Sequence, residues 1–246
     1  MIHVDHDTKL FLKFTDAILS TSYIKVCPHE HPNLADCIIK SIEELRPRLA
    51  TGIPELNIPS LEPFTLSPIQ INSVGGGTRL ATNVSDIEVH GASNFKILKL
   101  TPTLTKKGQN FRYEVNVPRL RLKAKYQLDS KILFLDLKGE GPFEANVTDY
   151  HFECIMKGEK VKRNENNYLE FEKMKCNLVI GEVSVFLGKL FEQNPAISKA
   201  TNDVINDNAQ VFFEEIKPGL LNALTEKFTD IANKITLTFT YEELFP

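Results

Sequence analysis

Two cysteines and two histidines near the start of the chain are the residues best suited to chemistry. Cys27, His29, His31 and Cys37 stand close together in the sequence. Thiolate and imidazole groups are both zinc ligands, so a metal site is one reading of this set. The spacing matches no common zinc finger, and a disulfide between Cys27 and Cys37 that clamps the entrance of a following helix fits better. We therefore predict a disulfide here and no metal.

A second cysteine pair, Cys154 and Cys176, lies where the sequence alternates as strands do. If a hairpin turn centres on Glu165, Cys154 faces Cys176 and Phe152 faces Leu178. Two outcomes fit this register: a disulfide across the hairpin, or two reduced cysteines that pack as small apolar groups. Local pairing of all four cysteines favours disulfides and an oxidising compartment.

Motifs for covalent or nucleotide chemistry do not occur in the sequence. There is no Gly-x-Ser-x-Gly elbow, His-Glu-x-x-His helix, phosphate loop or dinucleotide fingerprint. The run Gly75-Gly-Gly-Thr-Arg79 lacks the lysine and hydroxyl spacing of a phosphate loop and indicates a turn. The sequence thus predicts no enzyme, no catalytic residue and no cofactor.

A basic stripe, formed by Arg119, Arg121, Lys123 and Lys125, follows one face of a predicted strand. It is either a site for a partner or headgroup, or a solvated outer face, and we favour the solvated face. The aromatic residues needed to stack on bases point to the opposite face. A formal net charge of -3 also gives no reason to expect nucleic acid or an anionic membrane as the main partner.

The length of 246 residues allows one large domain that buries roughly 70 to 75% of its unfolded surface. No run reaches the ~18 to 20 apolar residues that a membrane span requires, so we predict no integral membrane association. The run from Leu10 to Ser20 is apolar but carries Lys13 and Asp16, so residues 1–20 are predicted to be an altered leader or an N-terminal extension. We expect residues 21–246 to form a single domain, in a secreted protein.

A short helix followed by an extended segment is predicted after the first cysteine pair. Apolar residues recur at helical spacing from Leu34 to Leu49, and Gly52 is a natural stop. Asn33 is expected to cap this helix, with Asp36 completing a capping box. Proline is frequent over residues 47–63, which predicts a path extended along a surface or edge.

The next hundred residues alternate between apolar and polar side chains with period two. Alternation is clearest over residues 111–117 and 120–128, with further runs at 85–100, 131–138, 143–156 and 168–187. Such runs predict an antiparallel meander that is covered on one face.

A helical period returns between Asn194 and Ile235. Asn194 suits the N-cap and Pro195 the first helical position, and Pro218-Gly219 is a site for a bend. Some forty residues at ~1.5 Å each span about 60 Å, more than the ~45 Å of a compact sphere of this length. We therefore expect an elongated α+β molecule, in which a curved antiparallel sheet wraps one long C-terminal helix.

Together these segments resemble the takeout and juvenile hormone binding protein family of insects, within the wider group of tubular lipid-binding proteins. The resemblance extends from about Ser20 to the end of the chain. It rests on Tyr23-Ile-Lys-Val-Cys27, Asn33-Leu-Ala-Asp-Cys37, Gly52-Ile-Pro-Glu-Leu-Asn-Ile-Pro-Ser-Leu-Glu-Pro63, Leu190-Phe191 and Tyr241-Glu-Glu-Leu-Phe-Pro246. The second cysteine pair is closer to the haemolymph hormone carriers, because takeout-like proteins usually have only the first pair.

The resemblance implies an apolar tunnel between the helix and a highly curved sheet. The tunnel would hold a small hydrophobic ligand, such as a juvenile hormone, another terpenoid, or an acyl-chain or quinone-like molecule. Apolar and aromatic residues of the predicted elements are the candidates for its lining: Phe64, Leu66, Ile69, Phe95, Leu98, Phe111, Tyr113, Tyr126, Phe134, Phe143, Phe152, Met156, Phe171, Phe186, Phe191, Phe212 and Phe228. Tyr113, Tyr126 and Tyr168 are candidates for orienting a polar group of the ligand.

The predicted function is that of a non-catalytic carrier in haemolymph or another extracellular fluid. Burial of the ligand's apolar surface would supply the affinity, at ~25 cal/mol per Å². The first helix and the proline-rich segment are expected to seal one end of the tunnel through Ile53, Leu56, Ile58, Leu61 and Phe64. Two alternatives stay open: an interaction protein that uses its surface to bind a receptor or another carrier, and a lipid-ester hydrolase.

Overall fold

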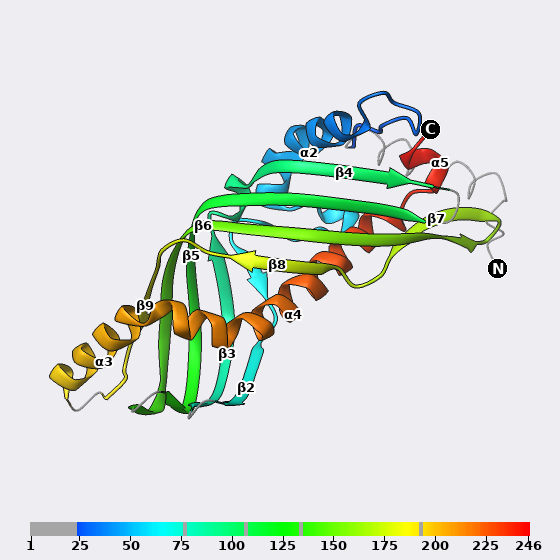
Figure 1. Cartoon of the computed structure of the whole chain (residues 1–246). Coiled ribbons are helices and arrows are strands. Elements are labelled where there is room, and N and C mark those ends of the chain that lie inside the picture. Colours follow the sequence, from blue (N-terminus) through cyan, green and yellow to red (C-terminus); the bar gives the residue numbers. More distant parts are fainter. Residues whose placement is uncertain (1–23, 76–77, 106–107, 133–134, 192–193) are drawn as a thin grey trace, which may run out of the picture.

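The computed structural model describes residues 24–246, except 76–77, 106–107, 133–134 and 192–193. The molecule is elongated, and a long sheet lies along a C-terminal helix (Figure 1). The described strands form one antiparallel sheet with the central order β1-β3-β5-β6-β7. Its strands are β1 (Phe64–Leu66), β2 (Ile69–Gly75), β3 (Thr78–His90), β4 (Lys96–Leu104), β5 (Gln109–Ile132), β6 (Leu135–Arg163), β7 (Asn166–Phe171), β8 (Lys175–Val179) and β9 (Val183–Leu187).

The predicted first helix is α2 (Leu34–Thr51). Its predicted capping box is wrong, because the Asn33 side chain makes no cap hydrogen bond, and its backbone N–H donates to His31 Nδ1 at 3.1 Å. Pro47 is accommodated inside the helix, which ends at Gly52 with φ 88°. Glycine is required there, since a Cβ would stand 2.9 Å from the backbone nitrogen of Ser60.

The sequence predicted that the segment after α2 is extended. In the structure, only part of this segment is extended. Pro54 begins a 3-10 turn, η1 (Pro54–Leu56), because its fixed φ suits a first helical position. An antiparallel bridge between Ile53 and Ile58 closes the turn. Ile53, Leu56 and Ile58 are buried with Phe239 in a small core, against which Ile24 and Leu244 pack.

Strands β5 and β6 form the spine of the sheet and pair from Gln109↔Gly158 to Ile132↔Leu135. Both strands bend at the same level, and the bend divides the sheet into an upper and a lower part (Figure 1). Pro118 lies in β5 at this level, and Asp149 of β6 has a left-handed φ of 47°. Proline lacks a donor for the ladder, so pairing is interrupted where the strands bend.

The predicted runs and the strands differ in several regions, and the run 168–187, for example, is divided into β7, β8 and β9. The run 85–100 is two strands, because a turn that contains η2 (Ala92–Asn94) separates β3 from β4. The β6–β7 hairpin turns at Asn164 and Glu165, which both have positive φ, so the turn is shorter than predicted. The register shifts by one residue between β7 and β8, and this restores the predicted pairs Cys154↔Cys176 and Phe152↔Leu178.

The C-terminal helical region consists of α3 (Pro195–Asp207), α4 (Ala209–Thr236) and a final turn, α5 (Tyr241–Leu244). The Asn194 cap and the position of Pro195 are confirmed, since Asn194 Oδ1 accepts from the N–H of Ile197 at 3.2 Å. The helix continues through Pro218, and a break that the sequence did not predict lies at Asn208.

Helix α4 closes the open sheet into a tube. It packs against β1 and β2 at one edge and against β7, β8 and β9 at the other. Gly219 permits a close approach, because a Cβ there would stand 3.2 Å from Ile71 of β2. The concave face of the sheet and one side of α4 therefore face each other across the interior.

Candidate functional site: an apolar cavity between the sheet and the helix

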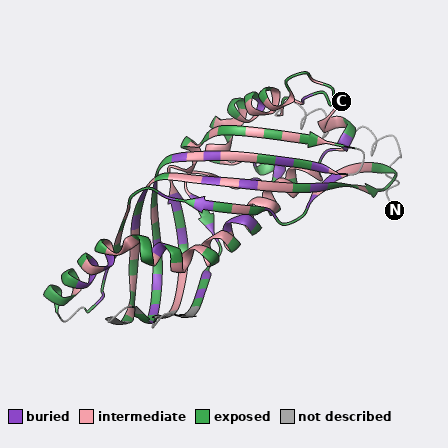
Figure 2. Cartoon of the chain, in the orientation of Figure 1, coloured by how far each residue is buried: buried purple, intermediate pink, exposed green. Residues whose placement is uncertain are grey.

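A cavity of about 720 Å³ lies between the concave face of the sheet and α4. Strand β5 contributes residues of opposite parity on the two sides of its bend: Phe111, Tyr113, Val115 and Val117 before it, then Leu120, Leu122, Tyr126 and Leu128. Burial alternates along the strands in the same way (Figure 2). Because the bend occurs at the change of parity, both halves turn their apolar sides to one interior.

Most of the predicted lining residues stand in the wall of this cavity. They come from β1, β5, β6, β7, α4 and the turn before β4: Phe64, Leu66, Phe95, Phe111, Tyr113, Tyr126, Phe143, Phe152, Met156, Phe171, Phe212 and Phe228. Four of these rings are in mutual contact, since Phe64 and Phe152 each pack on Phe228, and Phe152 also packs on Tyr113. Their role in ligand binding stays a prediction.

Among the described residues, four that were predicted do not line the cavity: Ile69, Leu98, Phe186 and Phe191. Leu98 is 56% exposed, because the register shifts between Ile97 and Lys99 and turns it outward. Phe186 is 55% exposed, since it alternates with the inward Val185 and Leu187. Ile69 is buried but packs near Gly219 instead.

Phe191 and Tyr168 also lie away from the cavity wall. Phe191 is 37% exposed and has a left-handed φ of 55° before α3. Tyr168 is half-buried on β7. Phe134 lies outside the described residues.

Few polar groups face the cavity, and most have partners in the protein. The Tyr113 hydroxyl donates to Met174 Sδ at 3.2 Å, and that of Tyr126 donates to the Gly188 carbonyl at 2.9 Å. The Ser41 hydroxyl donates to the Lys25 carbonyl at 2.7 Å. Burial raises the pKa values of Tyr113 and Tyr150, as expected in a medium that disfavours charge.

Tyr150 is a polar residue of the cavity wall that the sequence did not predict. It lines the cavity, where its ring centre lies 6.1 Å from that of Phe152. The available signal was its spacing from Phe152, which places both side chains on one face of β6. A phenol in an apolar cavity can donate one hydrogen bond to a ligand.

Phe95 is held in the wall by a polar clamp around η2. The Glu62 carboxylate accepts from the N–H groups of Gly91 and Ser93, both at 2.9 Å. Arg46 donates to the carbonyl oxygens of Ser93 and Phe95, and its guanidinium stacks 4.2 Å from the centre of the Phe95 ring. The clamp thus connects α2 with the turn that presents Phe95.

Segments near both chain ends close the upper part of the cavity. Residues 24–27 and the pair Leu244 and Phe245 line it together with α2. The N–H of His29 donates to the Pro246 carbonyl at 3.2 Å, so the two segments are joined directly. Leu61 and Phe64 line the cavity here, as predicted for the seal, whereas Ile53, Leu56 and Ile58 belong to the neighbouring small core.

Both predicted cysteine pairs are disulfides. Cys27–Cys37 fastens residue 27 of the cavity wall to α2, and Cys154–Cys176 joins β6 to β8. Across the described ranges, no group of three or more His, Cys, Asp or Glu side chains could hold a metal ion. The zinc reading of Cys27, His29, His31 and Cys37 is therefore replaced by the disulfide.

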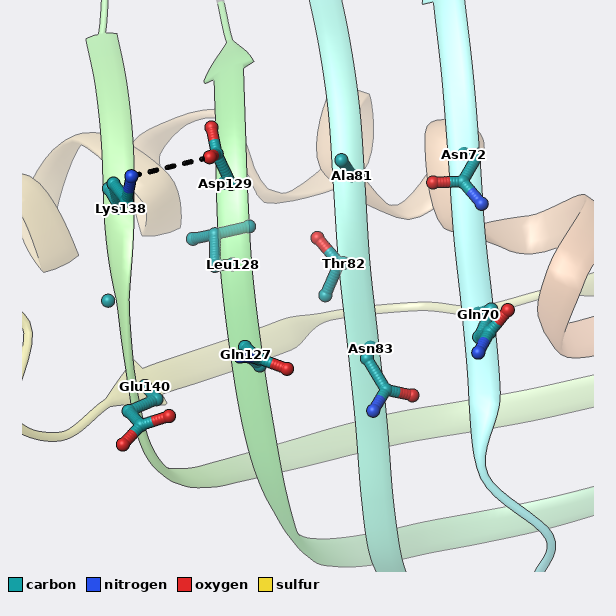
Figure 3. Close-up of a pocket in the computed structure, with 11 residues that line it drawn as sticks. Gln70, Asn72, Ala81, Thr82, Asn83, Gln127, Leu128, Asp129, Lys138 and Glu140 are labelled. Atoms are coloured by element: carbon teal, nitrogen blue, oxygen red, sulfur yellow. Dashed lines mark ion pairs between the residues drawn. The ribbon is translucent and has the colours of Figure 1, made fainter.

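The outer face of the sheet is polar. Gln70, Asn83, Gln127 and Glu140 form one cross-strand row over β2, β3, β5 and β6. With a second row that includes Asn72, Ala81 and the ion pair Lys138–Asp129 at 3.6 Å, they border a hollow of about 490 Å³. Figure 3 shows both rows on the face of the sheet opposite the helix. This hollow does not suit an apolar ligand.

The basic stripe lies on this outer face, with all four residues exposed. Arg121 pairs with Glu144 at 3.1 Å, and Lys125 pairs with Asp86 at 2.8 Å. The neighbouring acids reduce its positive potential, which agrees with a solvated face. Among the helices within the described ranges, none is long and apolar enough to cross a membrane.

Comparison with known proteins identifies a family and relatives of this chain. Residues 10–246 match the family described as haemolymph juvenile hormone binding protein. The circadian clock-controlled protein daywake of Drosophila melanogaster is 24% identical over 215 residues, which cover 85% of this chain and 83% of daywake. A protein of Schistocerca gregaria, named as a candidate beta-carotene-binding protein, is 24% identical over 218 residues, 87% of this chain and 85% of that protein.

A solved structure supports the fold. The crystal structure of Takeout 1 from Epiphyas postvittana has a TM-score of 0.75 to this chain at 18% identity. The match covers 86% of this chain and 95% of that structure. The expected α+β fold, with a curved antiparallel sheet along a long C-terminal helix, is confirmed.

Proposed function

Because the chain belongs to the haemolymph juvenile hormone binding protein family, we propose that it carries a small lipophilic molecule in the cavity between the sheet and α4. The continuous apolar lining of that cavity is the observation that carries the proposal. Its volume of about 720 Å³ falls in the range of ~300 to 1,000 Å³ typical of small-molecule sites. Transfer of the ligand's apolar surface from water supplies the affinity.

The polar groups of the cavity wall limit which functional groups the ligand can carry. Tyr150 offers one hydrogen bond, while the hydroxyls of Tyr113 and Tyr126 are already bonded within the protein. Lys25, the one cation in the described cavity wall, is half-exposed and stands 3.8 Å from Glu44. A neutral ligand with a single acceptor, such as an ester, epoxide, ketone or quinone, suits this interior better than an anion.

The proposal includes secretion into an extracellular fluid such as haemolymph. Two disulfides within the described residues support it, because such bridges persist in oxidising compartments. The predicted leader or extension, residues 1–20, lies outside the described residues, and the single domain at 21–246 stays a prediction. The carotenoid named for the locust relative is of the same lipophilic class as the proposed cargo.

Native mass spectrometry after gentle purification tests the carrier role. We expect a lipophile to co-purify in stoichiometric amount, or a neutral fluorescent lipophile to be taken up by ligand-free protein. The variant Ala145→Phe places a ring in the cavity, whereas Ala81→Phe places the same ring on the outer face of the sheet. Uptake should fall for the first variant and stay unchanged for the second.

Other results would favour the alternatives. A protein that neither carries nor takes up a lipophile would favour an interaction protein that acts through its surface. Turnover of a lipid ester that disappears when one serine or histidine is replaced would favour a hydrolase.

A further inference from the structure

Two asparagines of α3 take the place of a neighbouring strand at the edge of the sheet. Asn206 Oδ1 accepts from the N–H of Val185, and its Nδ2 donates to the Val185 carbonyl, both at 2.8 Å. Asn202 Oδ1 accepts from the N–H of Leu187 at 2.8 Å, and its Nδ2 donates to the Leu187 carbonyl at 3.1 Å. These four hydrogen bonds, here termed the latch, hold α3 against the edge of β9.

The cavity lies directly behind the latch. Val185 and Leu187 line the cavity from β9, and Ile205 and Ala209 line it from the helical side. The seam between β9 and α3 is therefore a single layer of wall. If α3 moved away from β9, the interior would open to the outside at this seam.

The corresponding seam at the other end of α4 is reinforced. Asn233 makes the same two-bond contact with Phe171 of β7, at 2.7 and 3.0 Å. The Thr229 hydroxyl accepts from the N–H of Met174 at 3.0 Å, and the Cys154–Cys176 disulfide fastens the adjacent strand β8 to β6. The described part of β9 has no such covalent attachment.

The helix break at Asn208 gives α3 a place to pivot. Asn208 has φ -118° and ψ 22°, outside helical geometry, and it separates α3 from α4. Exposed apolar side chains also gather in this part of the chain: Phe186 on β9, Ile197 on α3 and Val211 at the start of α4. Figure 1 shows α3 projecting at the end of the molecule away from α5 and the C-terminus.

We propose that the seam between β9 and α3 is the portal for the ligand, which opens when the latch breaks and α3 turns about Asn208. This inference rests on the proposed carrier function. In the closed state the latch satisfies the backbone groups of Val185 and Leu187, and in the open state water does so. The latch thus adjusts how often the portal opens, while the cavity walls determine affinity.

The test compares exchange rates for a latch variant and a matched control. The double variant Asn202→Ala/Asn206→Ala removes the latch, and Asn233→Ala removes the equivalent contact at the reinforced seam. Protein loaded with N-phenyl-1-naphthylamine, a neutral fluorescent lipophile, is mixed with excess unlabelled competitor in a stopped-flow instrument. We expect release about tenfold faster from the latch variant, the change that corresponds to ~1.4 kcal/mol, and a change of less than about twofold in the control.

The equilibrium constant separates the portal from a general loss of structure. For a portal, association and dissociation accelerate together, so the Kd for the probe stays within about threefold of wild type. Unchanged release from the latch variant, or equal acceleration in Asn233→Ala, would overturn the portal. The single variant Asn206→Ala, expected to accelerate release to a smaller extent, serves if the double variant does not fold. Failure of the wild-type protein to bind the probe would instead count against the carrier function.

Discussion

Glu62 and Ser93, which are far apart in the sequence, are joined by two hydrogen bonds: the carboxylate accepts from the Ser93 N–H at 2.9 Å and from its hydroxyl at 2.8 Å. Burial acts to raise the pKa of the Glu62 carboxyl. Hydrogen bonds from Gly91 and Ser93, together with the charge of His90, outweigh burial and hold this pKa below its usual value. The ionised carboxylate is thus the form that the fold stabilises.

Glu62→Gln should destabilise the protein by about 1 to 2 kcal/mol, because a charged acceptor of several hydrogen bonds is replaced by a neutral amide. Urea denaturation at neutral pH measures the effect. The control Glu55→Gln changes an exposed carboxylate of η1 and should leave stability within about 0.5 kcal/mol of wild type.

The difference between wild type and Glu62→Gln should depend on pH in one direction. Since the folded-state pKa of Glu62 is depressed, its contribution is full above the unfolded value of about 4.5 and disappears as the pH falls through the folded value. If the difference in stability between wild type and Glu62→Gln stays constant down to pH 3, or grows in acid, the pKa of Glu62 is not lowered in the folded state.

Tyr150→Phe should weaken binding of a neutral acceptor ligand about tenfold, because one hydrogen bond of ~1.4 kcal/mol is lost while the ring remains. Displacement of a bound fluorescent probe by a ketone or ester lipophile measures the change in affinity. Tyr168→Phe removes the same hydroxyl outside the cavity wall and should bind normally. Equal affinities for wild type and Tyr150→Phe would remove this tyrosine from the ligand site.

Leu98→Asp and Leu100→Asp test the bulge in β4. Leu98 is exposed, so its replacement should change the free energy of unfolding by less than about 0.5 kcal/mol. Leu100 lines the cavity, and a carboxylate there should destabilise by about 3 kcal/mol and reduce probe uptake. Similar effects of the two substitutions would instead place Leu98 and Leu100 on one face of an unbroken strand and contradict the bulge.

Removal of either disulfide should lower the free energy of unfolding by about 3 kcal/mol, as chain-entropy arguments give for loops of this size. The Cys27–Cys37 and Cys154–Cys176 bridges close loops with separations of 10 and 22 residues. The double variants Cys27→Ser/Cys37→Ser and Cys154→Ala/Cys176→Ala remove them. Chemical denaturation of each double variant checks the values. Variants as stable as wild type would show that the bridges contribute nothing to stability.

The alternation of apolar residues was sufficient to predict which sides of β5 and β6 face inward. The inward residues change parity at Pro118, and the sequence showed this change without revealing that the paired strand bends at the same level. Leu98 was misplaced for a related reason, because a one-residue bulge depends on the partner strand and leaves no local signal. Family resemblance supplied the tunnel, which periodicity could not distinguish from a filled core.

The helical region contains a break that local propensity did not predict. Proline breaks helices by removing a donor and by steric conflict, so a bend was expected at Pro218. Helix α4 accommodates Pro218, while the break falls at Asn208, whose Nδ2 donates to the Val204 carbonyl at 2.8 Å. Asn202, Asn206 and Asn233 were missed as well, because their partners are backbone groups of strands distant in sequence.

The two asparagines of α3 are four residues apart, and the β9 residues that they contact are two apart. Four helical residues advance ~6.0 Å and two strand residues ~6.6 Å, so the two repeats nearly coincide over one step and separate over longer distances. A helix can therefore complete a sheet for about one repeat only. Since the peptide groups of Val185 and Leu187 are already bonded, they offer no template for a strand of another molecule. The same contacts that close the tube thus also protect its edge from aggregation.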